Sequence, residues 1–186
     1  MSEEYIGSLY ENLEENLIEF IKSENIDIIT FRSLLRSSVE ISEQDVSPAT
    51  IGIISADASK GKRVHIRNYQ FNLKHALDMI YATKTAVKSD GIMLVLAMIK
   101  VFLLLTDEFV LEFDSSDAVV LLCIHRLRGG SATRIYEYAK QLDNQIAAAE
   151  FSFEELEGIL DKLEKIKMIQ LIDGEYQLRD RIYITS

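Results

Sequence analysis

Proline and cysteine are nearly absent from this chain of 186 residues, which contains one Pro, one Cys and eight Gly. Long stretches without turn signals favour helices over an all-β fold, and the absence of low-complexity tracts excludes long disordered linkers. The single cysteine, Cys123, cannot form an internal disulfide, and in the apolar run 118–124 it would pack as a small hydrophobic side chain. These scarcities predict a mainly helical protein in a reducing compartment, most simply the cytoplasm.

Secretory and membrane signals are also missing. A signal peptide has a basic start followed by an apolar run, whereas this chain starts with Met1-Ser2-Glu3-Glu4. The most apolar stretch, 92–105, is shorter than the roughly twenty residues of a membrane span. It also contains Lys100. We therefore expect a buried central helix over 91–106 and no membrane partner.

Acidic residues outnumber basic ones, and the net charge of −10 is unevenly distributed. Residues 1–57 carry three basic and twelve acidic side chains, whereas residues 58–88 carry seven basic ones and a single acidic one. This basic segment could bind nucleic acid or an acidic partner, or dock on the protein's own acidic N-terminal helix. We favour the internal docking, because charge runs are usually solvated or paired. The candidate binding residues of the segment are Lys60, Lys62, Arg63 and Arg67.

Apolar spacing predicts helices over 3–23 and 28–38 and a further helix that begins near Asn72, whose side chain can cap it. The stripe of Ile6, Leu9, Leu13 and Leu17 on the first helix would cover the central helix or close a homodimer. Residues 40–70 allow a short helix opened by Ser47-Pro48, or a hairpin with strands 51–55 and 64–69. We favour the hairpin.

Residues from 115 onward give an ordered series of local signals. A helix capped by Ser115 or Ser116 ends at Gly129-Gly130, and a second helix follows Ser131. A third helix begins with the capping box 152–155. The spacing of apolar residues then changes to the two-residue period of strands. We expect a strand over 168–172, followed by the turn Asp173-Gly174. The return strand is predicted to carry Tyr176, Leu178, Ile182 and Ile184.

Three helices followed by a β-hairpin, with a short strand over 109–113 before the first helix, resemble the winged-helix superfamily across about residues 109–184. The expected fold is mainly α, with an N-terminal helical bundle and its small hairpin in 1–108. A winged-helix domain in 109–186 follows.

DNA-binding winged helices insert the first turns of the third helix into the major groove. In this chain those turns carry Glu154, Glu155, Glu157 and Asp161, whose carboxylates would repel phosphate. The connection 143–151 is longer than the turn of a DNA-reading motif. The wing tip, 173–175, is acidic as well. These departures disfavour DNA as the partner.

No motif for catalysis, metal binding or cofactor binding is present. Residues 56–63 resemble a phosphate-binding loop, but Ala56 and Arg63 stand where the pattern needs Gly and Ser or Thr. The three histidines show no ligand spacing, and Cys123 and His125 would point apart on a helix. We therefore expect a protein that is not an enzyme and holds neither a cofactor nor a metal.

Two hypotheses for the function of the protein are consistent with these observations. The first is a protein-interaction module, namely an adaptor, an inhibitor or an immunity or antitoxin protein, that uses the four carboxylates of the third helix to bind a basic protein. The second is a transcriptional regulator whose N-terminal part dimerises or senses a ligand. We favour the first because the charge pattern opposes DNA binding.

Overall fold

The computed structural model describes residues 3–46, 64–82, 89–106, 112–142 and 151–185, and this part of the chain is mainly helical, as predicted. The helices are α1 (Glu3–Ser23), α2 (Ile28–Ser38), α4 (Leu73–Ala82), α5 (Ser89–Thr106), α6 (Ser115–Leu127), α7 (Ala132–Leu142) and α8 (Phe153–Lys165). The strands are β1 (Val39–Val46), β2 (Val64–Phe71), β3 (Ile169–Ile172), β4 (Glu175–Leu178) and β5 (Ile182–Thr185).

The central buried helix is confirmed as α5. Nearly all of its side chains from Ile92 to Leu105 are buried, and the ring of Phe102 lies 5.4 Å from that of Phe71 at the end of β2. Helices α1, α4 and α6 pack against it. None of the helices in the described ranges is long and apolar enough to cross a membrane.

The predicted N-terminal helices 3–23 and 28–38 are confirmed as α1 and α2. Asp27 caps α2 by accepting a hydrogen bond of 2.9 Å from the Thr30 amide. Leu17 and Ile21 of α1 are buried, so the apolar stripe of this helix contributes to the core of the monomer. A homodimer stays a prediction.

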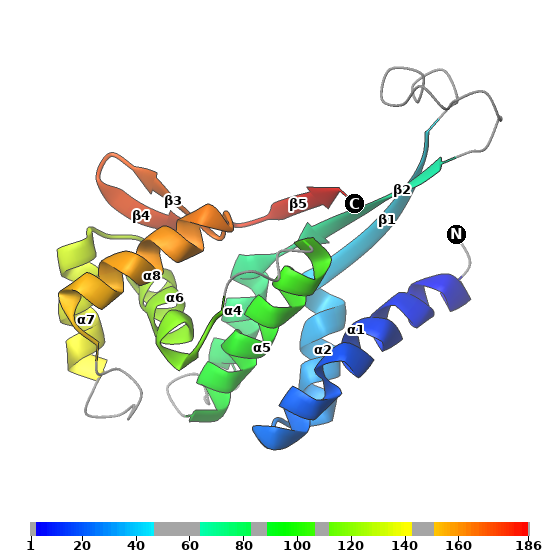
Figure 1. Ribbon diagram of the computed structural model, residues 1–186, viewed down its shortest axis with the longest axis horizontal. Helices are drawn as coiled ribbons and strands as arrows, with labels where there is room; N and C mark the ends of the chain where they lie inside the picture. The colour runs from blue at the N-terminus through cyan, green and yellow to red at the C-terminus, as the bar shows by residue number, and fades with distance from the viewer. Residues whose placement is uncertain (1–2, 47–63, 83–88, 107–111, 143–150, 186) are drawn as a thin grey trace.

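The strands form two antiparallel sheets, in the order β1-β2-β5 and β3-β4. Figure 1 shows β1 and β2 as a long ribbon that reaches away from the helices, with β5 beside its base. Because β5 follows the other described strands in sequence, its pairing with β2 ties the C-terminal region to the N-terminal region.

The hairpin predicted within 40–70 is partly confirmed. Its second strand, predicted at 64–69, is β2, whereas the strand that pairs with it is β1, at 39–46, directly after α2. The predicted strand 51–55 and its turn lie outside the described residues. The helix expected near Asn72 is α4, and the Asn72 Oδ1 atom accepts a hydrogen bond of 3.3 Å from the His75 amide.

Two details of the C-terminal prediction are wrong. Asp114, and neither of the serines after it, caps α6: its carboxylate accepts a hydrogen bond of 2.7 Å from the Ser116 amide, while the Asp117 carboxylate accepts one of 2.7 Å from the Asp114 amide. The return strand is also shorter than predicted, because β4 ends at Leu178 and Ile182 begins β5 in the other sheet. Of the strand predicted at 109–113, Glu112 and Phe113 adopt no regular structure and the rest lies outside the described ranges.

The chain between α6 and α7 pairs with the β3-β4 hairpin. Gly130 exchanges backbone hydrogen bonds of 3.1 and 2.8 Å with Tyr176 of β4. Gly129 has φ +102°, and a Cβ atom there would lie 3.2 Å from the Tyr176 carbonyl oxygen, so a glycine is needed at this close approach. The hairpin turn has positive φ at both Asp173 and Gly174, as the predicted two-residue turn requires.

Candidate functional site

The carboxylates predicted to bind a partner lie on the solvent-exposed side of α8. Glu154, Glu157 and Asp161 are exposed and follow one another at helical spacing, and Glu164 continues the row. We call these four residues the acidic stripe. The opposite side of the helix is buried through Leu156, Ile159, Leu160 and Leu163.

Glu155, the fourth predicted carboxylate, has a structural role. Its Oε2 atom accepts a hydrogen bond of 2.6 Å from the Ser152 amide, and the Ser152 hydroxyl accepts one of 3.1 Å from the Glu155 amide. This is the capping box that the sequence predicts. These hydrogen bonds lower the pKa of the Glu155 carboxyl, and the side chain stabilises the start of α8.

The acidic stripe lies beside the β3-β4 hairpin, where the Leu171 amide donates a hydrogen bond of 3.4 Å to the Glu164 Oε1 atom. Partial burial and the carboxylates of Asp161, Glu164 and Glu157 raise the pKa of the Tyr176 hydroxyl, so this side chain lies within their field. Leu171 is the cross-strand partner of Tyr176, and its side chain is 49% exposed. The stripe therefore lies beside an exposed apolar side chain.

The basic segment is only partly described. Lys60, Lys62 and Arg63 lie outside the described residues, and Arg67 belongs to β2, where it is paired in register with Glu43 of β1. Within the described ranges, Lys74 is the basic residue of this segment with an ion pair, and its partner is Asp180 rather than the acidic α1 helix. On α1, Glu14 pairs with Arg32 of α2.

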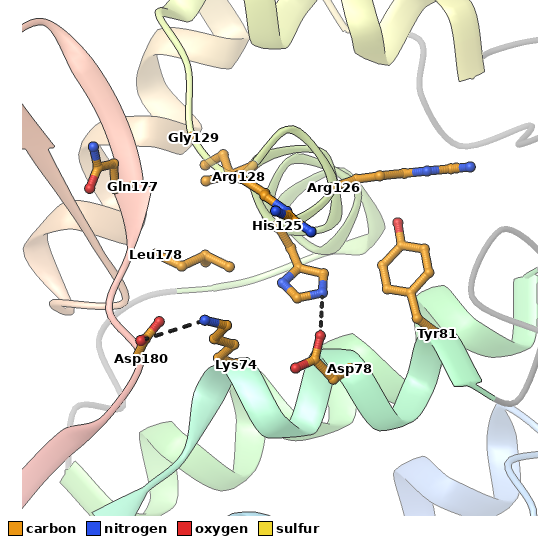
Figure 2. A pocket seen from close by; sticks show the side chains of 11 residues that line it. Lys74, Asp78, Tyr81, His125, Arg126, Arg128, Gly129, Gln177, Leu178 and Asp180 are labelled. Atoms are coloured by element: carbon orange, nitrogen blue, oxygen red, sulfur yellow. Dashed lines mark ion pairs between the residues drawn. The ribbon is translucent and has the colours of Figure 1, made fainter.

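A second candidate site is a cleft of about 730 Å³ between one side of α4, the end of α6 and β4. Figure 2 shows Lys74, Asp78 and Tyr81 along α4, facing His125, Arg126 and Arg128 at the end of α6. Gln177, Leu178 and Asp180 form the third wall. The cleft therefore lies where the N-terminal helices meet the C-terminal helices and hairpin.

The best-defined contact in the cleft joins His125 to Asp78. The His125 Nε2 atom lies 3.1 Å from the Asp78 Oδ1 atom, and the imidazole ring lies 5.3 Å from the ring of Tyr81. Burial lowers the pKa of His125, and the carboxylate of Asp78 opposes this shift. Sequence spacing could not reveal this pair, because α4 and α6 meet only in the folded chain.

Cys123 is buried in α6. Burial raises the pKa of the Cys123 thiol to about 12, so it stays protonated and unreactive. Within the described residues, no three His, Cys, Asp or Glu side chains are grouped so that they could hold a metal ion.

No protein-family model, curated protein or solved structure matches this chain.

Proposed function

We propose that the protein is a non-catalytic interaction module that binds a basic protein partner through the acidic stripe and the adjoining hairpin. It would act as an adaptor, an inhibitor or an immunity or antitoxin protein. The observation that carries this proposal is the continuous row of exposed carboxylates, Glu154, Glu157, Asp161 and Glu164, beside exposed Leu171. An apolar contact next to complementary charge gives both affinity and fast association.

We further propose that the C-terminal region is a winged helix. The order α6-α7-α8-β3-β4 and the backbone pairing of Gly130 with Tyr176 support this proposal. In such a fold α8 would be the third helix and β3-β4 the wing, so the acidic stripe would occupy the surface that contacts DNA in the DNA-binding members.

A winged-helix transcriptional regulator is the alternative. It is supported by the order of elements alone, which is weak evidence for function. Four exposed carboxylates on the third helix would repel the phosphate backbone. Lys60, Lys62 and Arg63 would then have to supply most of the phosphate contacts.

The first experiment is gentle purification of the tagged protein at low salt, with the eluate analysed for both protein bands and nucleic acid. A triple charge reversal, Glu154→Lys with Glu157→Lys and Asp161→Lys, should abolish a stoichiometric partner. Glu155 stays unchanged because it caps α8. The matched control reverses Glu11, Glu15 and Glu19, which are equally exposed on α1.

The proposed surface is supported if the α8 variant loses the partner and the α1 variant keeps it. Circular dichroism must show that both variants are folded. Equal retention in both variants would exclude the acidic stripe. Nucleic acid that is released steeply as salt rises would favour the regulator, and replacing Lys60, Lys62, Arg63 and Arg67 should then weaken that binding.

A further inference from the structure

The cleft between α4, α6 and β4 gathers basic side chains in an acidic protein. Lys74, Arg126 and Arg128 line it together with two acidic residues, Asp78 and Asp180, although the whole chain has a net charge of −10. Both acidic residues already contact a partner: Asp78 contacts His125 at 3.1 Å and Asp180 contacts Lys74 at 3.7 Å. The local balance therefore favours an anion.

Arg128 is the cation available to a ligand. It is exposed at the end of α6, and no carboxylate contacts it among the described residues. Its backbone has φ +57°, in the left-handed region that glycine and asparagine adopt more readily. Arg126, by contrast, lies over the rings of Tyr81 and Tyr138, at 5.8 and 6.0 Å.

The other polar groups of the cleft complement a bound oxyanion. The ammonium of Lys74 is half-exposed and is 3.7 Å from Asp180, a loose pair that can also contact a ligand. Gln177 lies at the edge of the cleft, and Figure 2 shows its side-chain amide pointing away from Lys74 and His125. His125 supplies an imidazole on the same surface.

We propose that this cleft binds a small molecule through a carboxylate or phosphate group, which Arg128 and Lys74 hold from the α6 and α4 walls. Leu178 and Tyr81 provide apolar surface for the rest of the molecule. The volume of about 730 Å³ lies within the range of small-molecule sites. Occupancy would link α4, α6 and β4, and this role is independent of partner binding by the acidic stripe.

The test is isothermal titration of the full chain with inorganic phosphate and, separately, with succinate, both at fixed ionic strength. Saturable binding of phosphate or of succinate identifies the group that the cleft accepts. Two variants remove one cation each, Arg128→Asn and Lys74→Gln. Two controls, Lys22→Gln and Lys165→Gln, remove exposed cations on α1 and α8 outside the cleft.

Arg128→Asn separates binding from folding, because asparagine fits the left-handed conformation and should leave the protein at least as stable. We expect each cleft variant to lose roughly tenfold in affinity, the effect of one charged hydrogen bond. The controls should keep the affinity of the wild type. The His125 ring signal should shift on titration in the NMR spectrum while that of exposed His75 stays in place.

Two outcomes would overturn the proposal. One is the absence of saturable binding for both probes. The other is an equal loss of affinity in the cleft variants and in the controls, which would mean diffuse attraction to the surface.

Discussion

The two ends of the molecule each contain a short ion pair between neighbouring helices, in opposite surroundings. In the C-terminal region, the Lys162 Nζ atom of α8 lies 2.6 Å from the Asp117 Oδ1 atom of α6, and the Asp117 side chain is fully buried. In the N-terminal region, the Arg32 Nη2 atom of α2 lies 2.6 Å from the Glu14 Oε1 atom of α1, and the Arg32 side chain is 52% exposed.

Equal distances do not mean equal roles, because the Asp117 carboxylate is fully buried whereas the Arg32 side chain is half-exposed to water. Lys162 also donates a hydrogen bond of 3.0 Å to the Glu112 carbonyl and lies over the ring of Phe113, so it closes the junction between α8 and the start of α6. Burial raises the pKa of Asp117, with Lys162 as the main opposing influence. At the exposed pair, Arg32 lowers the pKa of Glu14.

The largest effect is expected for Lys162→Met, which keeps the length of the side chain and removes its charge. The Asp117 carboxylate would then be buried without a cation, which typically destabilises a protein by about 3–5 kcal/mol. Urea unfolding near neutral pH measures the change, and Lys165→Met, on the exposed side of α8, is the control. Equal unfolding midpoints for the two variants would show that the buried pair is not needed.

The destabilisation caused by Lys162→Met should be smaller at acidic pH. Without Lys162, burial alone would raise the pKa of Asp117 further, and protonation of the folded state would remove the unpaired charge as the pH falls.

A smaller effect is expected for Ser152→Ala, which removes the hydroxyl that caps α8. Loss of an N-cap side chain typically costs about 1 kcal/mol of stability. Glu155→Gln should change the thermal midpoint much less, because glutamine serves the same position of a capping box. If Glu155→Gln were as harmful as Ser152→Ala, the charge of Glu155 would matter more than its hydrogen bond.

Much of the C-terminal region could be predicted from the sequence because its signals are local. The Ser152–Glu155 box and the Asp173-Gly174 turn each act within a few residues, so the order of residues specifies them directly. The cap of α6, Asp114, lies one residue before Ser115 and two before Ser116, the two predicted caps. Asp114 and Asp117 form the reciprocal hydrogen bonds of a capping box, and neither Ser115 nor Ser116 takes part in them.

The sheet and the cleft could not be predicted, because long-range pairing creates them. β1 carries Glu40, Glu43 and Asp45, residue types that are uncommon in strands, and its formation depends on pairing with β2. The alternation of Ile182 with Ile184 is the same for either sheet and does not select a partner strand. The cleft brings together α4, α6 and β4, so no sequence window contains it.

A third contact between helices joins His125 of α6, whose side chain is 13% exposed, to Asp78 of α4, whose side chain is 58% exposed. Burial lowers the pKa of His125 in the folded state, with Asp78 opposing and Lys74 reinforcing the shift. An unfolded histidine takes up a proton near pH 6.5, whereas the folded protein resists protonation until a lower pH. The stability that neutral His125 contributes should therefore be fully present above about pH 6.5. It should be lost as the pH falls from there toward the lower pKa of the folded state.

Thermal midpoints measured above and below this window test the expectation. His125→Gln should flatten the decline on the acid side, and His75→Gln, at an exposed position of α4, should leave it unchanged. A decline that persists fully in His125→Gln would assign the pH dependence to other groups.

The smallest effect is expected for Arg32→Gln at the exposed pair. Arg32 makes hydrogen bonds of 2.7 and 2.6 Å to Glu14, but its side chain is half-exposed and both charges regain water when the pair is broken. We expect a slight decrease in the urea midpoint at low salt that disappears at high salt, where screening already weakens the pair. Lys22→Gln, at an exposed cation of the same region, gives the baseline. A loss of stability that does not depend on salt and equals that of Lys162→Met would contradict this expectation. It would mean that the bidentate geometry of Arg32, and not burial, determines how much each ion pair stabilises the fold.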